Sequence, residues 1–479
     1  MIRRSGLVLL ILIIASVLRL WMLNGGDVTD DEKHYITEAQ RLLNKDPYIA
    51  IRYHPRKHPE PSIGHPFLYQ IEQASIFKVL GLSVYTSRLP NALSGIAIVA
   101  IMFMFTKQLG KSVALLAAFF MAILPMAVKY SRNAQLDTVF TLWITLTALS
   151  IWKYLNEDKK YWLIAGGVFA GFTISTKLNG VYIVPMVLLL LTFAKGEKLS
   201  FNLIKKVFIE SLWVGIPAGI ISFLLNDPLA YIDGIVNPSF GAYNFFSKEF
   251  VIQRIPFLFS PKSFYLFLKV NFLILSPGFL LTAFFALYFL VFKAKNVARR
   301  FLLLWIFPFL HLFMIHGLRM DGVYGWIPLI PPVTLAIAIF INRLEKRIRN
   351  LSVFGVTILS LPSLFLYGLS LAPVPFGDFP SNHNRTIYQN FYQDTIERVN
   401  EITPKNGSVF FLPQVYYPLY ALRQDISWSY YGDLSKFDVF VVESHGVLRD
   451  ITDELEFVEI RVKDQDDAKL SRMIFKKKS

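Results

Sequence analysis

Residues 161–194 read YWLIAGGVFAGFTISTKLNGVYIVPMVLLLLTFA, and this stretch decides the fold class. It consists of two apolar segments, 161–176 and 179–194, which are interrupted only by Lys177 and Leu178. Because a bilayer core takes about 20 apolar residues of helix, we expect two membrane-spanning helices. They would be joined by a tight hairpin that carries a lysine at its turn.

The rest of the chain continues this apolar pattern. Of its 479 residues, 54% are hydrophobic and 17% are charged, whereas soluble domains carry about 25% charged residues. Mean hydropathy is +0.45. Nine further candidate spans are Gly6–Leu23, 90–106, 112–128, 137–152, 207–225, 264–292 (with a kink expected at Pro277-Gly278), 301–316, 324–341 and 351–372. We therefore predict a polytopic α-helical membrane protein with about 11 transmembrane helices.

The basic residues between these spans predict the orientation of the chain. If the N-terminus is inside, the inside segments are Met1–Ser5, 107–111, 153–160, 195–206, 293–300 and 342–350. They hold 19 Lys or Arg against four acids, an excess equal to the whole net charge of +15. Since cytoplasmic loops are enriched in Lys and Arg, we predict a cytoplasmic N-terminus. The positive charge then requires no nucleic acid as a partner.

Two kinds of region fall outside the membrane in this orientation. The outer loops 24–89 and 226–263 are long enough to be functional. Residues 375–479 have a soluble composition, and we expect a small extracytoplasmic α/β domain there, beside a transmembrane domain over 1–374. Its predicted elements are a helix over Thr386–Glu401, a turn at 404–407 and strands over Val409–Leu412, Val439–Glu443 and Phe457–Val462.

Carboxylates at the predicted outer surface are candidates for acid–base chemistry. Asp30, Asp31 and Glu32 follow the first span, and Asp137 begins the apolar fourth span. An acid at a membrane boundary is costly unless it is paired or functional, and one such group could act as a general base. Helix capping accounts for the same positions equally well. Arg132 is a further candidate, as an ion-pair partner for Asp137.

Basic residues also occur near the predicted outer surface, against the inside bias. They are Arg19, Arg88, Lys129, Arg132, Lys177, Arg254, Lys262 and Arg319. Such residues would bind a phosphate through charge-assisted hydrogen bonds; the alternative for any one of them is snorkelling at a helix end. Lys177 is the hardest to explain by snorkelling, because no acid lies near it in the sequence.

Metal and thiol chemistry are constrained by composition. The absence of cysteine excludes disulfides, cysteine-ligated zinc, Fe–S clusters and thiol catalysis. His54, His58 and His65 share the first outer loop with acids, so a divalent cation is conceivable there. Their spacing matches no familiar zinc pattern, so we assign no metal ligands and no certain cofactor.

Six short motifs occur in the order typical of one enzyme family. They are Asp31-Glu32-Lys33-His34-Tyr35, Gly64-His65-Pro66-Phe67-Leu68, Arg88-Leu89-Pro90, Arg132 to Asp137, Gly167 to Gly171 followed by Thr176-Lys177-Leu178-Asn179-Gly180, and Tyr324-Gly325-Trp326-Ile327-Pro328 with Pro331-Pro332. Together they resemble the GT-C glycosyltransferases of the protein O-mannosyltransferase and aminoarabinose transferase type (glycosyltransferase family 39-like). The resemblance covers roughly residues 1–345.

The resemblance implies an inverting glycosyltransferase that takes a sugar from a polyprenyl-phosphate donor at the outer membrane face. The implied catalytic residues are Asp31, Glu32 and Asp137, and the implied substrate-binding residues are His65, Arg88, Arg132, Lys177, Arg319 and Tyr324. Phe67 departs from the family's second proline in the His65 motif, and Asp30 is the alternative to Asp31 as the base. The sugar is not implied, nor is the acceptor, which could be a protein hydroxyl, a lipid or a glycan.

A transporter or flippase of a lipid-linked sugar is the alternative function. It would explain the spans and the interfacial basic residues equally well. It does not explain long outer loops with clustered acids. Transport also predicts functional charges within the membrane, for which the chain offers few candidates, Glu210 and His311.

Overall fold

The computed structural model describes residues 2–24, 28, 30–43, 66–225, 274–293, 297–317, 327–369, 395–412, 426–429, 437–442, 455–465 and 468–477. The chain divides into two compact units. The first comprises Met1–Gly26 and Arg41–Phe379, and the second comprises Asp27–Gln40 and Pro380–Ser479. The predicted domain boundary at residue 374 stays a prediction.

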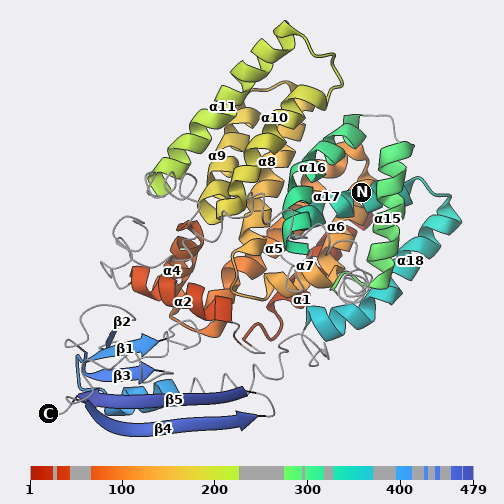
Figure 1. The fold of residues 1–479 in the computed structure, drawn as a ribbon. Helices are drawn as coiled ribbons and strands as arrows, with labels where there is room; N and C mark the ends of the chain where they lie inside the picture. The colour runs from red at the N-terminus through yellow and green to blue at the C-terminus, as the bar shows by residue number, and fades with distance from the viewer. Residues whose placement is uncertain are drawn as a thin grey trace. The chain divides into compact units, whose positions relative to one another are not determined.

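The first unit is built from helices around an apolar interior (Figure 1). They are α1 (Ile2–Leu20), α4 (Leu68–Leu80), α5 (Val84–Thr106), η2 (Lys107–Leu109), α6 (Lys111–Ile123), α7 (Pro125–Ser131), α8 (Asp137–Glu157), α9 (Tyr161–Thr176), η3 (Leu178–Tyr182), α10 (Ile183–Phe193), α11 (Phe201–Leu225), α15 (Pro277–Phe292), α16 (Val297–Gly317), α17 (Ile330–Asn342), α18 (Lys346–Ser363) and the π-helical η6 (Leu364–Gly368). α9 packs between α8 and α11.

Several of these helices have the length and composition of membrane spans. Among the described residues, four helices are long and apolar enough to cross a bilayer, or up to six if each bent pair counts as one span. Shorter apolar helices occur in α1, α9, α10 and α17. The chain is thus largely helical with several apolar helices, as predicted, while the count of about 11 stays a prediction.

The predicted span over 112–128 is bent rather than straight. α6 and α7 meet at 60°, because Pro125 has no N–H to donate to the Met121 carbonyl one turn earlier. Arg19 fills the gap: it has no exposed surface and donates to the carbonyls of Met121 and Ala122, each at 3.0 Å. Inside a membrane no water can serve those carbonyls. Arg19 is therefore a buried helix cap and does not snorkel.

α9 and α11 approach each other at two glycines spaced four residues apart. A Cβ added to Gly171 would lie 2.7 Å from the Cβ of Ile221, and one added to Gly167 would collide with the Val214 carbonyl. Small residues at this spacing let helix backbones pack closely. The glycine motif therefore fixes α9, whose end carries Lys177, against its neighbour.

Pro277 lies at the start of a helix. It is the first residue of α15, directly after Ser276 at a φ of 72°, and the kink expected here within the span 264–292 stays a prediction. At the first helical position the missing N–H has no cost, and Ser276 supplies the cap by accepting from the Phe279 amide at 3.3 Å. The preceding residues 264–273, and the outer loop 226–263, lie outside the described residues.

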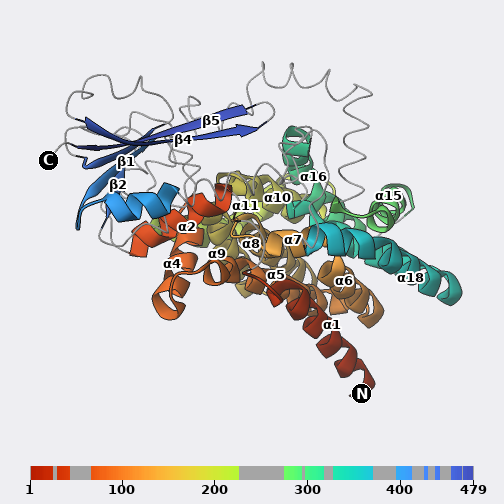
Figure 2. The same cartoon turned by 90° about the horizontal axis from the view of Figure 1, so that it is seen from below.

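The second unit contains most of α2 (Asp30–Leu43) and a five-stranded mixed sheet (Figure 2). The strands are β1 (Ser408–Leu412), β2 (Ser427–Ser429), β3 (Val439–Val442), β4 (Leu455–Gln465) and β5 (Ala468–Lys477), in the order β2-β1-β3-β5-β4. β1 is parallel to β2 and β3, whereas β5 is antiparallel to β3 and β4. Ile396 and Val399, from a helical segment over 395–402, share an apolar core with β1, β3 and β5.

The predicted elements of this region appear in part. The three predicted strands correspond to β1, β3 and β4, and the predicted turn holds Asn406 at a φ of 57°, with Gly407 donating to Pro404 at 3.1 Å. β2 and β5 were not predicted, because β2 has only three residues and β5 mixes lysine and arginine with its apolar positions. The extracytoplasmic location of this region stays a prediction.

Candidate active site

Two predicted site residues form one ion pair in the first unit. Nζ of Lys177 lies 2.6 Å from Oδ1 of Asp137, and the two side chains are 16% and 6% exposed. Asp137 begins α8 and Lys177 follows the last residue of α9. Since α8 and α9 pack together as a hairpin, these two ends meet. An acid therefore lies next to Lys177 in space, although none lies near it in the sequence.

The turn after α9 holds Lys177 in place. Its backbone is extended, with φ −148° and ψ 141°, and its carbonyl accepts from the Gly180 amide at 2.7 Å. A Cβ on Gly180 would lie 2.6 Å from the Thr173 carbonyl oxygen, so a side chain at this position would force the turn open. The Thr-Lys-Leu-Asn-Gly motif thus encodes a tight turn that brings the lysine to the start of α8.

Asp137 is not a helix cap. Leu136 occupies the N-cap of α8 and makes no side-chain cap bond. The Asp137 carboxylate stands in the first turn, where the helix dipole favours a negative charge. Its ion-pair partner is Lys177, and Arg132, the partner suggested by sequence proximity, makes other bonds. The capping interpretation therefore does not account for this acid.

Arg132 and Arg88 both bind the end of α1. Arg132 donates to the carbonyls of Trp21 at 2.6 Å, and of Leu18 and Met22 at 3.2 Å each. Arg88 donates to the Leu23 carbonyl at 3.0 Å. Both side chains are buried, and burial together with the positive charge of Arg88 lowers the pKa of the Arg132 guanidinium. These arginines anchor the segment that leads out of α1 toward the acids of the first loop.

Two further polar residues near this end of the bundle were not predicted. Asn91 of α5 donates to the carbonyls of Asn133 and Gln135, which ties α5 to the segment before Asp137. Glu72 lies in α4, and burial raises the pKa of its carboxyl to about 8. The only sequence signal for Asn91 is a polar side chain at the start of an apolar stretch. Glu72 has none, because the desolvation that raises its pKa depends on packing.

The other predicted site residues lie either in the second unit or outside the described residues. Glu32 lies in α2 of the second unit and has no exposed surface. Asp31 belongs to the same helix, but its side chain lies outside the described residues, as do His65, Arg319 and Tyr324. In the parts of the chain that the structure describes, no group of three or more His, Cys, Asp or Glu could hold a metal ion. His54 and His58 fall outside those parts, so the divalent cation stays a prediction.

The part of the chain that contains the Lys177–Asp137 ion pair is similar to known proteins. Residues 60–220 match the family described as dolichyl-phosphate-mannose-protein mannosyltransferase. This chain is also similar to YkcB of Bacillus subtilis (strain 168), a protein that carries the provisional name of a mannosyltransferase. The two sequences are 29% identical over 144 residues. That match spans 30% of this chain and only 20% of YkcB. The family match includes Arg88, Arg132, Asp137 and Lys177.

Solved structures share the fold over nearly the whole chain. ArnT from Cupriavidus metallidurans is similar in the apo state (TM-score 0.65, 15% identity) and bound to undecaprenyl phosphate (TM-score 0.63, 14% identity), each over 98% of both chains. The Archaeoglobus fulgidus oligosaccharyltransferase in the apo form has a TM-score of 0.58 at 12% identity, over 84% of this chain and 58% of that one. The predicted resemblance to the GT-C glycosyltransferases of the protein O-mannosyltransferase and aminoarabinose transferase type is thereby confirmed.

Proposed function

We propose that this protein is an inverting glycosyltransferase that moves a sugar from a polyprenyl-phosphate donor to an acceptor at the outer membrane face. The observation that carries the proposal is the Lys177–Asp137 pair. It places a partly exposed ammonium and a nearly buried carboxylate at the ends of two apolar helices, within the region that matches the mannosyltransferase family. The likeness of the fold to ArnT, solved with undecaprenyl phosphate, supports the class of donor.

Lys177 is the residue that we assign to the donor phosphate. Its ammonium is partly exposed while the Asp137 carboxylate beneath it is nearly buried, so a ligand reaches the lysine first. A phosphate at the membrane boundary would form a charge-assisted hydrogen bond with this ammonium. Asp137 then serves to hold the lysine in position, and it remains a second acid of the site.

We assign Arg132 and Arg88 to positioning the end of α1. Both terminal nitrogens of Arg132 donate to carbonyls at the end of α1, and Arg88 binds the next carbonyl along the chain. Their role in catalysis would be to fix where the first outer loop begins. His65, Arg319 and Tyr324 stay proposed substrate contacts on the strength of their motifs, and Glu32 stays a proposed partner of Asp31.

The transfer requires one base and one stabilised leaving group. Asp31 takes the proton from the acceptor hydroxyl as its oxygen attacks the anomeric carbon. The new C–O bond forms on the face opposite the phosphate, and the old C–O bond breaks with its electron pair moving onto the lipid phosphate. Lys177 stabilises the charge that develops there. Attack from the opposite face inverts the anomeric configuration.

The test uses purified full-length protein and a labelled polyprenyl-phosphate sugar, with release of sugar from the lipid as the readout. Asp31→Asn should lower the rate by about 10²- to 10⁴-fold while the donor still binds, and Asp30→Asn is the matched control. Full activity in Asp31→Asn would overturn the assignment of the base. Movement of intact donor between leaflets without cleavage would support a transporter instead.

A further inference from the structure

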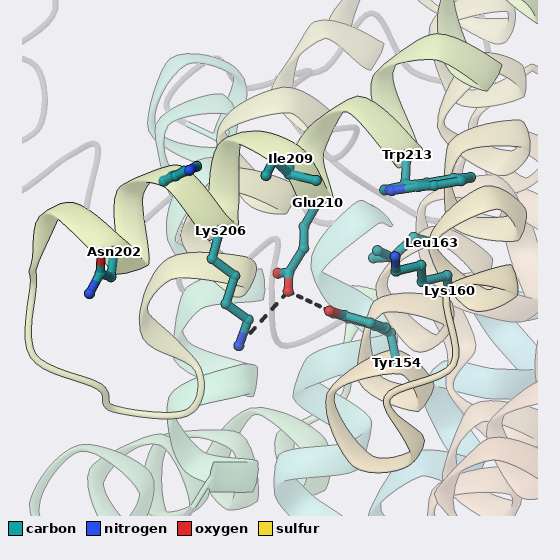
Figure 3. A pocket seen from close by; sticks show the side chains of 9 residues that line it. Tyr154, Lys160, Leu163, Asn202, Lys206, Ile209, Glu210 and Trp213 are labelled. Carbon is teal, nitrogen blue, oxygen red and sulfur yellow. Dashed lines mark hydrogen bonds and ion pairs between the residues drawn. The ribbon is translucent and has the colours of Figure 1, made fainter.

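A cavity lies at the far end of α8 from the Lys177–Asp137 pair. At 1.5 Å per residue, the stretch of α8 from Asp137 to Tyr154 is about 25 Å long, close to the thickness of a bilayer core. There Tyr154, the start of α9 and the first turns of α11 line a cavity of about 330 Å³ (Figure 3). In the predicted topology the cavity and the candidate active site therefore face opposite sides of the membrane.

Three of the nine residues that line the cavity are lysines. Lys160, Lys205 and Lys206 line it, against the single carboxylate of Glu210. That carboxylate is already occupied: it accepts from the Tyr154 hydroxyl and lies 3.9 Å from Nζ of Lys206 (Figure 3). Within the described parts of the chain, no acid pairs with Lys160 or Lys205. Two positive charges are thus left to attract an anion.

An exposed apolar strip on α11 continues from this cavity. Ile209 and Trp213 line the cavity, and Ile216 and Ile220 follow on the same helical face. Their exposed fractions are 46%, 39%, 59% and 55%. The Lys160 ammonium lies over the Trp213 ring, 5.4 Å from its centroid. A basic cavity that opens onto an apolar strip matches a negatively charged headgroup joined to an acyl chain.

We propose that this cavity binds the phosphate headgroup of an anionic phospholipid, with one acyl chain along the α11 strip. Lys205 contacts the phosphate, Asn202 on the same helix supplies an amide donor, and Lys160, on the opposite side of the cavity beside Trp213, adds a positive charge (Figure 3). The predicted orientation puts the cavity at the cytoplasmic leaflet, where anionic lipids attract Lys and Arg. This site is separate from the donor phosphate site at Lys177, and it does not depend on the transferase reaction.

The proposal is tested by lipid binding to delipidated full-length protein in neutral detergent. The probe is phosphatidylglycerol with brominated acyl chains, which quench nearby tryptophans, and native mass spectrometry counts the bound lipids. The double variant Lys160→Ala/Lys205→Ala should bind about 30-fold more weakly. The matched control Lys107→Ala/Lys111→Ala removes two lysines from another predicted inside segment and should bind like the unaltered protein. Trp213→Phe, which leaves seven of the eight tryptophans, should lower the quenching signal.

Three results would overturn the proposal. Phosphatidylcholine that binds as tightly as phosphatidylglycerol would show that the headgroup charge is not recognised. An equal loss in the Lys107/Lys111 control would show a general effect of charge. Displacement of the lipid by millimolar inorganic phosphate, with the same dependence on Lys160 and Lys205, would identify a site for a soluble anion instead.

Discussion

Burying the charge of Lys177 or of Asp137 alone would cost free energy of folding. In the ion pair, the attraction between the two charges offsets part of that cost. Removing one partner of a buried pair leaves an uncompensated charge, at a cost of about 3–5 kcal/mol. We therefore expect Lys177→Met or Asp137→Leu alone to lower the thermal unfolding midpoint in detergent. The double variant should lose much less than the sum of the two, because its residues are coupled. Strictly additive losses would contradict the pair, and donor binding should fail in both variants that lack the lysine.

Glu72 predicts a pH dependence of stability. Its folded-state pKa, about 8, lies above the ordinary value of 4.5. Between those values the unfolded chain loses this proton and the folded chain keeps it, so stability falls as pH rises from about 4.5 to 8. Glu72→Gln removes this loss. The unfolding midpoint of the variant, relative to the unaltered protein, should rise through that window and level off above it; a constant difference would contradict the raised pKa of Glu72.

The partners of these charges show where sequence interpretation reaches its limit. The motifs identified Lys177, Asp137, Arg132 and Arg88 individually. Arg132 was expected to reach Asp137, five residues away, yet it donates to Leu18, 114 residues earlier in the chain. Apolar periodicity and motif order identify charged residues at a helix end. Which of these residues contact each other depends on how the helices pack, and the local sequence does not determine that packing.

At the scale of helices and strands, apolar runs predicted where most of the described helices lie, but they predicted few of the residues at which these helices begin and end. The 161–194 hairpin is present as α9, η3 and α10, with the turn at Lys177. The 112–128 run contains a 60° bend at Pro125, which its overall apolar composition does not indicate. β5 escaped prediction because strand pairing, and not its own alternation, stabilises it.

The close contact between α9 and α11 at Gly171 can be tested by substitution. Gly171→Leu would force a side chain into the space of Ile221, and overpacking of this kind costs about 1–3 kcal/mol or more. Gly215→Leu on α11 is the matched control, since nothing lies within 4 Å of a Cβ there. We expect Gly171→Leu to lower the unfolding midpoint and weaken donor binding through the displaced end of α9. Equal effects of the two substitutions would contradict the close contact.

At the scale of the whole molecule, the two ends of the helical unit use charge differently. At one end the described basic residues Arg19, Arg88, Arg132 and Lys177 are bonded to carbonyls or a carboxylate. At the other end Lys160, Lys205 and Lys206 are exposed. In the predicted orientation, the exposed lysines lie at the inner face with the excess of positive charge, whereas the buried, partnered charges lie at the outer face with the proposed site.

The predicted orientation can be measured directly because the chain has no cysteine, so one introduced thiol gives an unambiguous label. Lys198→Cys lies in a predicted inside segment, and Lys405→Cys lies in the C-terminal region after five further predicted spans. A membrane-impermeant thiol reagent on intact cells should label Lys405→Cys at once and Lys198→Cys only after permeabilisation, with the unaltered chain as a blank. An odd number of crossings puts the two positions on opposite faces. Labelling of both from one side would require an even number, and the reverse pattern would require the positive-inside assignment to be inverted.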